Sequence, residues 1–127
     1  MNKKLPEEMD IPGTLRKAIE HNDVATVQKC LQQGADPNHL TDFSEFETDN
    51  TGQPTTPLSL VVFCISNSFL KDEDLKQFAE ITKLLLKHGA DPKPAMELAE
   101  LRYGKYDPDL KGLFMDVLHL IAKELRS

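Results

Sequence analysis

The side chains of this chain that could do chemistry are scattered and form no recognisable catalytic set. Catalysis needs a nucleophile or a metal, a base, and a group that stabilises charge, all converging on one place. The sequence has no Gly-rich phosphate-binding loop, no Gly-x-Ser-x-Gly motif and no His-Glu-x-x-His motif. Its histidines are far apart, at His21, His39, His88 and His119. The sequence therefore predicts a protein that is not an enzyme and uses no cofactor.

Structural interpretations account for several of these residues. His21 and His88 each come near the end of a predicted helix, where a partial positive charge is favourable. Tyr103 and Tyr106 are interpreted as packing and turn residues. Cys30 and Cys64 lie in apolar helical patterns, without a second Cys or a His at metal-ligand spacing. Two buried free thiols are the preferred interpretation, which favours a reducing compartment.

The acidic residues between positions 42 and 49 do not have the spacing of a metal site. A calcium loop needs ligands at alternating positions, a turn glycine and a bidentate Glu twelve residues from its start. The segment Asp49-Asn50-Thr51-Gly52 does not provide this spacing. We expect no metal and interpret these acids as part of a solvated loop.

The chain has 127 residues and a formal charge of −6, which fits one domain of ordinary globular composition. The acidic total argues against nucleic acid as a partner, because phosphates attract a basic surface. The basic N-terminus is not followed by the apolar stretch of a signal peptide. The longest apolar run, residues 60–65, is too short to span a bilayer. We expect a cytoplasmic protein that binds neither nucleic acid nor membrane.

Nearly all of the net charge comes from one stretch of the chain. Residues 1–29 carry five basic and five acidic side chains, and residues 71–127 carry ten and eleven. Residues 30–70 contain no Lys or Arg, and their five acids are Asp36, Asp42, Glu45, Glu47 and Asp49. The acids at positions 72–74 are interpreted separately, as a complement to the dipole at the start of the next helix.

One phrase occurs twice in the sequence. Gly-Ala-Asp-Pro stands at residues 34–37 and again at residues 89–92, each time after an amphipathic helical pattern. The glycine can take the left-handed conformation that closes a helix, and the aspartate can hold the turn with its side chain. Proline then prevents the helix from resuming. Two copies indicate an internal repeat.

A second phrase supports the repeat. Thr56-Pro57-Leu58 comes after a turn-rich segment, with Thr56 as a predicted N-cap and Pro57 at the first helical position. Together with the two Gly-Ala-Asp phrases, it resembles the ankyrin repeat, a unit of about 33 residues with a Thr-Pro-Leu-His-x-Ala signature. The resemblance covers roughly residues 13–127. It implies an all-α fold, a short solenoid of about three helix-turn-helix units.

The spacing of these phrases locates two insertions. Gly34 and Gly89 are 55 residues apart, about 22 more than one repeat. About 10 of the extra residues precede Thr56 and enlarge the loop between the repeats, which we call the finger, residues Asn38–Asn50. About 12 lie between the two helices of the second repeat.

The repeat pattern predicts six helices in one domain. Their expected bounds are about Thr14–His21, Val24–Gln33, Pro57–Asn67, Asp74–His88, Ala95–Tyr103 and Asp109–Leu125. Asn22 is expected to close the first helix, and Asp23 to cap the second, which buries Val27, Cys30 and Leu31. The apolar stripe of the fourth helix is Leu75, Phe78, Ile81, Leu85 and Leu86.

We divide the chain into an N-terminal segment and three units. Residues 1–12 are the N-terminal segment, and residues 13–48 are the first repeat with the finger. Residues 49–93 are the second repeat with its inter-helix insertion. Residues 94–127 form a degenerate capping repeat, because an end repeat must turn one face to water.

The finger is the main candidate for binding. It carries acids beside Leu40, Phe43 and Phe46, and aromatic anchors with steering carboxylates are typical of an interaction surface for a basic partner. Alternatively, both phenylalanines pack on the neighbouring repeat and leave the acids merely solvated. The predicted partner-binding residues are Asn38, His39, Leu40, Asp42, Phe43, Glu45, Phe46, Glu47 and Asp49, with Lys17, Glu20 and His21 on the first helix.

The resemblance implies a non-catalytic protein-protein interaction module. Size and charge suggest a stoichiometric inhibitor, such as an immunity protein that neutralises a basic toxin. We expect a monomer in the absence of its partner. The alternative is a structural subunit or self-associating scaffold that uses the same finger against a second copy.

Overall fold

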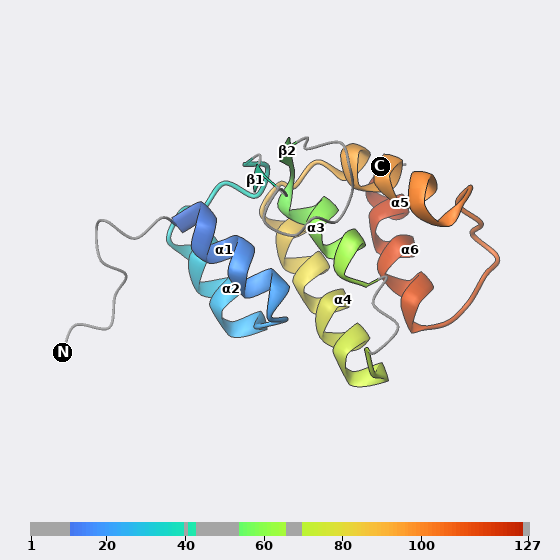
Figure 1. The fold of residues 1–127 in the computed structure, drawn as a ribbon, viewed down its shortest axis with the longest axis horizontal. Helices are drawn as coiled ribbons and strands as arrows, with labels where there is room; N and C mark the ends of the chain where they lie inside the picture. Colours follow the sequence, from blue (N-terminus) through green and yellow to red (C-terminus); the bar gives the residue numbers. More distant parts are fainter. Residues whose placement is uncertain (1–10, 40, 43–53, 66–69, 126–127) are drawn as a thin grey trace.

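The computed structural model describes residues 11–39, 41–42, 54–65 and 70–125. These residues form six helices and one pair of very short strands (Figure 1). In chain order the elements are α1 Ile11–Glu20, α2 Val24–Gln32, β1 Thr41–Asp42, β2 Pro54–Thr55, α3 Pro57–Cys64, α4 Asp72–Lys87, α5 Pro92–Tyr103 and α6 Leu113–Leu125. The prediction of an all-α fold is confirmed.

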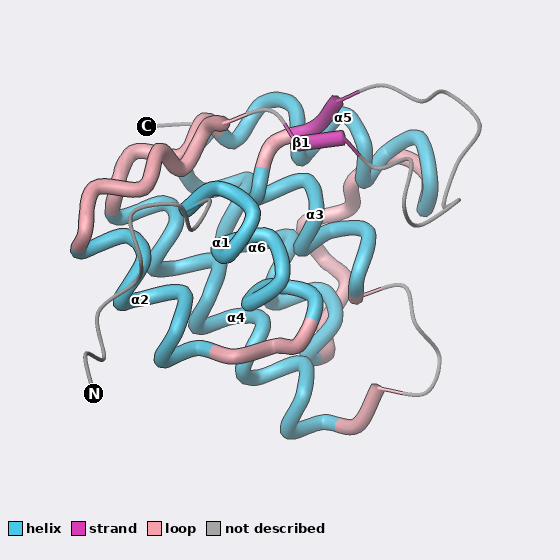
Figure 2. Tube along the Cα trace, turned by 60° about the vertical axis from the view of Figure 1, so that its left-hand side comes forward, coloured by secondary structure: helices cyan, strands magenta, loops and turns pink. Residues whose placement is uncertain are grey.

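The helices pack as three successive pairs in two layers. Each helix contacts its partner in the pair, α1 with α2, α3 with α4 and α5 with α6. Contacts between pairs join α1 to α3 and α3 to α5 in one layer, and α2 to α4 and α4 to α6 in the other (Figures 1 and 2). We call the layer of α1, α3 and α5 the odd layer.

The predicted N-caps begin their helices as expected. Thr56 Oγ1 accepts the Ser59 N–H at 3.2 Å, and Pro57 occupies the first turn of α3. Asp23 caps α2 by accepting the Thr26 N–H and, at 2.6 Å, the Thr26 hydroxyl. Both hydrogen bonds stabilise the charged carboxylate and hold the pKa of Asp23 below its usual value, and the bond from the Thr26 hydroxyl has the larger effect.

The two Gly-Ala-Asp phrases form the same turn. Gly34 and Gly89 have φ of 98° and 101°, a conformation that glycine adopts without strain from a Cβ. In both copies the glycine N–H donates three residues back, and the N–H of the next residue, an alanine, donates five residues back. Asn22, with φ of 57°, closes α1 as predicted.

The path of the chain after the turn differs between the two copies. After the first copy the Asp36 carboxylate accepts the Asn38 N–H and holds a loop. After the second copy Asp91 accepts the Lys93 N–H and caps α5, whose first residue is Pro92. The expectation that proline prevents a helix from resuming after the turn is therefore wrong at Pro92, because proline also fits the first turn of a new helix.

Two asparagine side chains tie the first helix pair to the second. Asn38 donates to the Gly89 carbonyl at 3.0 Å and accepts the Asp91 N–H at 2.6 Å, so it joins the two repeated turns. We call this pair of bonds the Asn38 bridge. At the other end of the pair, Asn22 donates to the Asp74 carbonyl and to Gln77 Oε1. The pairs are thus fixed to each other at both ends.

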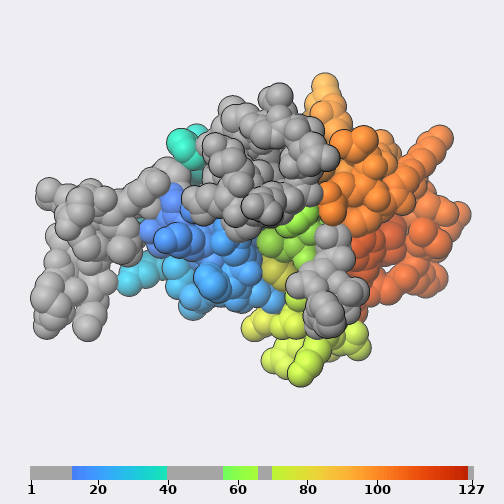
Figure 3. All heavy atoms as spheres, in the orientation of Figure 1, coloured from blue at the N-terminus to red at the C-terminus, as the bar shows by residue number. Residues whose placement is uncertain are grey.

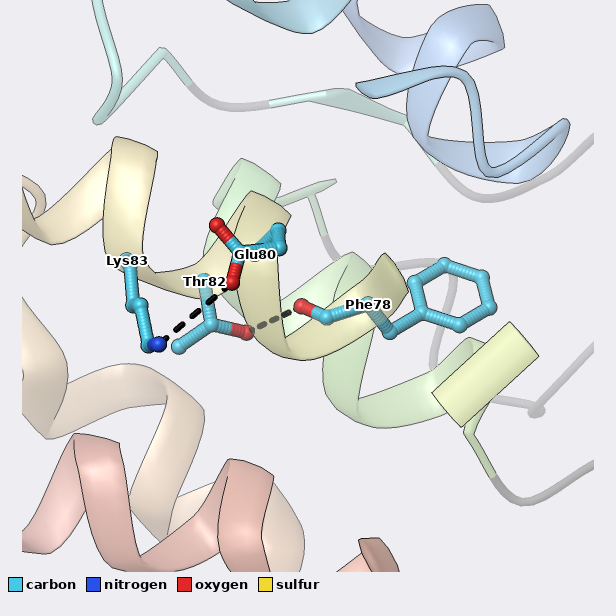
Figure 4. A network of polar contacts seen from close by, with 4 residues as sticks. All are labelled: Phe78, Glu80, Thr82 and Lys83. Carbon is cyan, nitrogen blue, oxygen red and sulfur yellow. Dashed lines mark hydrogen bonds and ion pairs between the residues drawn. The ribbon is translucent and has the colours of Figure 1, made fainter. Parts of the chain in front are cut away.

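The core lies between the two layers and is mainly aliphatic. Val27, Cys30 and Leu31 are buried as predicted. Of the stripe on α4, Phe78, Ile81 and Leu85 are buried, while Leu75 and Leu86 are half-buried. The polar Thr82 is also fully buried. Its hydroxyl is not left unpaired, because it donates to the Phe78 carbonyl at 2.9 Å (Figure 4). On the solvent side of α4, Lys83 pairs with Glu80 at 3.4 Å, an exposed contact that contributes little stability.

Four helix starts differ from the prediction, and each has a local reason. α1 begins at Ile11 instead of Thr14, since the first turn of a helix tolerates Pro12; this turn includes residues assigned to the N-terminal segment. α4 begins at Asp72 instead of Asp74, because the Asp74 carboxylate accepts the Lys71 N–H. The acids at 72–74 therefore lie in the first turn, as expected.

The third pair also departs from the predicted bounds. α5 begins at Pro92 and not at Ala95. α6 begins at Leu113 and not at Asp109, because Asp107 holds a turn by accepting the N–H groups of Asp109 and Leu110. α3 ends at Cys64, before the predicted Asn67, and residues 66–69 lie outside the described ranges.

The Asn38 bridge predicts a measurable contribution to stability. Asn38→Ala removes both bonds and leaves the Asp91 N–H without its side-chain acceptor, so the free energy of unfolding should fall by about 1–3 kcal/mol. Urea denaturation measures this change. The control is His39→Ala at the exposed next position. Equal stability of the two variants would show that the bridge contributes nothing.

Candidate functional site

Those predicted binding residues that the structure describes lie on or directly after α1, in the loop after α2 and in β1. β1 and β2 are antiparallel, with Thr41 opposite Thr55 and Asp42 opposite Pro54, and β1 contacts α1. The pairing brings the two ends of segment 43–53 together. The strands were not predicted, because two residues are too few to show an alternating pattern.

Most of the finger residues lie outside the described part of the chain. This holds for Leu40, Phe43, Glu45, Phe46, Glu47 and Asp49. Their binding role, and the question of whether the two phenylalanines pack or contact a partner, stay predictions. For Asp42 the structure describes the backbone, which belongs to β1.

The three predicted residues on and directly after α1 have different surroundings. Lys17 and His21 are exposed and four residues apart, so they lie on the same face of the chain where α1 ends. Glu20 is half-buried, and its carboxylate lies 3.5 Å from the guanidinium of Arg16. Arg16 is itself 9% exposed. Glu20 therefore takes part in an ion pair within the helix, which was not predicted, although the spacing of four residues could have indicated it.

The two residues that open the finger also differ. Asn38 uses both ends of its side-chain amide in the Asn38 bridge. Its predicted role in partner binding thus competes with a structural one that the sequence did not reveal. His39 is exposed, with its backbone N–H bonded to the Asp36 carbonyl.

The odd layer also carries contacts between α3 and α5 by residues that were not among the predicted binding residues. The Arg102 guanidinium of α5 lies 4.7 Å from the centroid of the Phe63 ring of α3, a cation–π distance. Arg102 is exposed and Phe63 is half-buried. Tyr103 donates its hydroxyl hydrogen to the Val62 carbonyl at 2.6 Å and so ties α5 to α3, in keeping with its predicted packing role.

The described residues were also compared with the requirements of a metal site and of a membrane span. Within ranges 11–39, 41–42, 54–65 and 70–125, no three His, Cys, Asp or Glu side chains lie close enough together to hold a metal ion. Both ring nitrogens of His119 are in hydrogen bonds, to Tyr106 and to the Leu110 carbonyl. None of the helices described is long and apolar enough to cross a membrane.

Both cysteines are free thiols within the helical layers. Cys30 is buried and Cys64 is half-buried. Burial raises the pKa of the Cys30 thiol, and it raises the pKa of Cys64 to about 12, with a further contribution from the negative charge of Glu20. Thiolate is the reactive form, so the raised pKa values lower the reactivity of both thiols.

The raised pKa of Cys64 predicts a loss of stability at alkaline pH. In the unfolded chain the thiol ionises near 9.0, whereas in the folded protein it ionises near 12. Between these values the unfolded state binds fewer protons, so the free energy of unfolding falls as pH rises. Urea denaturation below and above pH 9.0 should show a smaller alkaline loss for Cys64→Ala than for the original chain. The same loss in both proteins would contradict the assignment.

Comparison of the chain with known protein families, with curated proteins and with solved structures found no match. The function of the chain must therefore be argued from the arrangement of its own residues.

Proposed function

We propose that the chain is a non-catalytic protein-interaction module with the architecture of an ankyrin-repeat solenoid. The single observation that carries the proposal is the Asn38 bridge between two turns with the same backbone hydrogen bonds. The Gly-Ala-Asp phrase that is repeated in the sequence thus corresponds to a turn that is repeated in the structure. The stacking of three helix pairs in two layers supports the same architecture.

We infer that the acidic finger recognises a basic surface on another protein. Two observations support this inference. The strand pair holds the two ends of segment 43–53 together beside α1, where Lys17 and His21 are exposed. The segment is acidic, and residues 30–70 contain no Lys or Arg to neutralise it. Clustered charge of one sign steers a partner of opposite charge and selects against partners of like charge.

The most concrete form of this function is a stoichiometric inhibitor, for example an immunity-type protein for a basic toxin. This step rests on the size of the domain and on its charge. The competing function is self-association as a structural subunit. Light scattering at several protein concentrations separates the two, because an inhibitor should be a monomer without its partner.

Neutralising the finger tests the proposal. In the finger variant, Asp42 and Asp49 become Asn while Glu45 and Glu47 become Gln, which changes the formal charge from −6 to −2. The immobilised protein is used to capture partners from a lysate of the source cells, and affinity is then measured with the purified partner. The finger variant should bind at least about tenfold more weakly, and added salt should weaken binding of the original chain.

A control variant removes the same charge elsewhere. Glu80→Gln, Glu97→Gln, Asp109→Asn and Asp116→Asn change four exposed acids and give the same net charge. The control should bind as the original chain does. If the two variants lose affinity equally, only net charge matters and the finger is not the site. If no basic protein is captured, the proposed class of partner is wrong.

A further inference from the structure

A small pocket lies at the C-terminal end of the fold and is lined by residues of α6 and of the loop that joins α5 to α6. Figure 1 shows the course of this loop. In the space-filling view the third helix pair and this loop form the end of the molecule opposite α1 and α2 (Figure 3). The pocket has a volume of about 290 Å³. Its apolar walls are Tyr103, Tyr106, Leu110, Phe114, Met115 and Leu118.

The polar atoms of these walls are satisfied inside the protein. The Tyr103 hydroxyl donates to the Val62 carbonyl, and the Tyr106 hydroxyl lies 2.6 Å from Nδ1 of His119. Nε2 of the same histidine lies 2.7 Å from the Leu110 carbonyl, which can only accept, so Nε2 carries the hydrogen and Nδ1 accepts from the tyrosine. The tyrosines therefore offer the pocket their rings and keep their hydroxyl groups in internal bonds.

The walls are also held in place. The ring of Tyr103 meets that of Phe114 edge to face, with centroids 4.9 Å apart. Tyr106 and His119 pack edge to face as well, at 5.6 Å. Because His119 belongs to α6 and Tyr106 to the loop, this contact fixes the loop over the pocket. A binding site whose walls are already ordered loses less entropy when a partner enters.

The mouth of the pocket combines an exposed leucine with two ammonium groups. Leu110 is 52% exposed, and Lys105 and Lys111 are exposed lining residues. In the described part of the chain, neither lysine forms an ion pair. Asp107 also lines the pocket, but its carboxylate accepts the N–H of Asp109, which is not a lining residue. The charged lining residues are thus two lysines and one aspartate, which gives the mouth a net positive charge.

We propose that this pocket is a docking site for an acidic peptide segment of another protein, which inserts one large apolar side chain between the rings. The volume lies at the lower limit of the about 300–1,000 Å³ that small-molecule sites occupy, and suits one side chain. Carboxylates beside that side chain pair with Lys105 and Lys111. A buried anchor surrounded by a polar rim is the usual arrangement of a strong contact. This partner has the opposite charge to the one proposed for the finger.

The test titrates the full-length, isotope-labelled protein with a short synthetic peptide in which one Phe is flanked on both sides by Glu. Backbone resonances of residues 103–118 should shift, and those of α1 and α2 should not. Leu110→Glu, and Lys105→Glu combined with Lys111→Glu, should each raise the dissociation constant at least about tenfold. Leu101→Glu is the matched control, since Leu101 is 80% exposed and does not line the pocket.

Two further peptides make the outcome decisive. Replacing the Phe with Ser, or the Glu residues with Lys, should remove the resonance shifts. The proposal is overturned if the original peptide causes no shifts at millimolar concentration, or if the Lys-flanked peptide binds equally well. It is also overturned if light scattering shows that the chain self-associates and Leu110→Glu abolishes this, because the occupant is then a second copy. Circular dichroism confirms that each variant is folded.

Discussion

The burial of α3 is the constraint on which the rest of the structure depends. Every residue from Pro57 to Val62 is buried, so this helix has almost no surface to offer to water. Helices α1 and α5 flank it in the odd layer and α4 covers it from the second layer. Its first turn is polar but satisfied, since the Thr56 hydroxyl donates to Ser59 Oγ and accepts the Ser59 N–H. The middle pair could not be stable without a pair on each side.

The interactions between the pairs determine the register of this stack. Apolar packing alone would let neighbouring pairs slide, because contact between aliphatic surfaces is not directional. The Asn38 bridge and the bonds of Asn22 to Asp74 and Gln77 are directional, and they act at opposite ends of the first two pairs. The Tyr103 hydroxyl plays the same part between α5 and α3. Each pair is thus aligned by a few polar side chains at the margin of an apolar contact.

The features that were predicted correctly from the sequence depend on residues that are close to one another along the chain. The caps at Asp23 and Thr56 and the turns at Gly34 and Gly89 depend on residues within one helical turn, so their types are sufficient evidence. The start of α6 was wrong because the turn at Asp107 competes with the helix for the same N–H groups. The Asn38 bridge was missed because its partners lie more than fifty residues away. The pocket under the loop was missed for a different reason: its lining residues all fall within 103–118, but a cavity depends on how the loop lies over α6, which residue types alone do not reveal.

The strand pair has a consequence for how the chain can change over evolution. Thr41 and Asp42 pair with Thr55 and Pro54, so the segment between them starts and ends at one point on the fold. For such a closed loop the entropy of closure grows slowly, by only about 0.6 kcal/mol for each doubling of length. Changes in the number of residues between the two strands therefore alter the entropy of closure only slightly. The helical frame can therefore keep its packing while the segment between the strands changes in length over evolution.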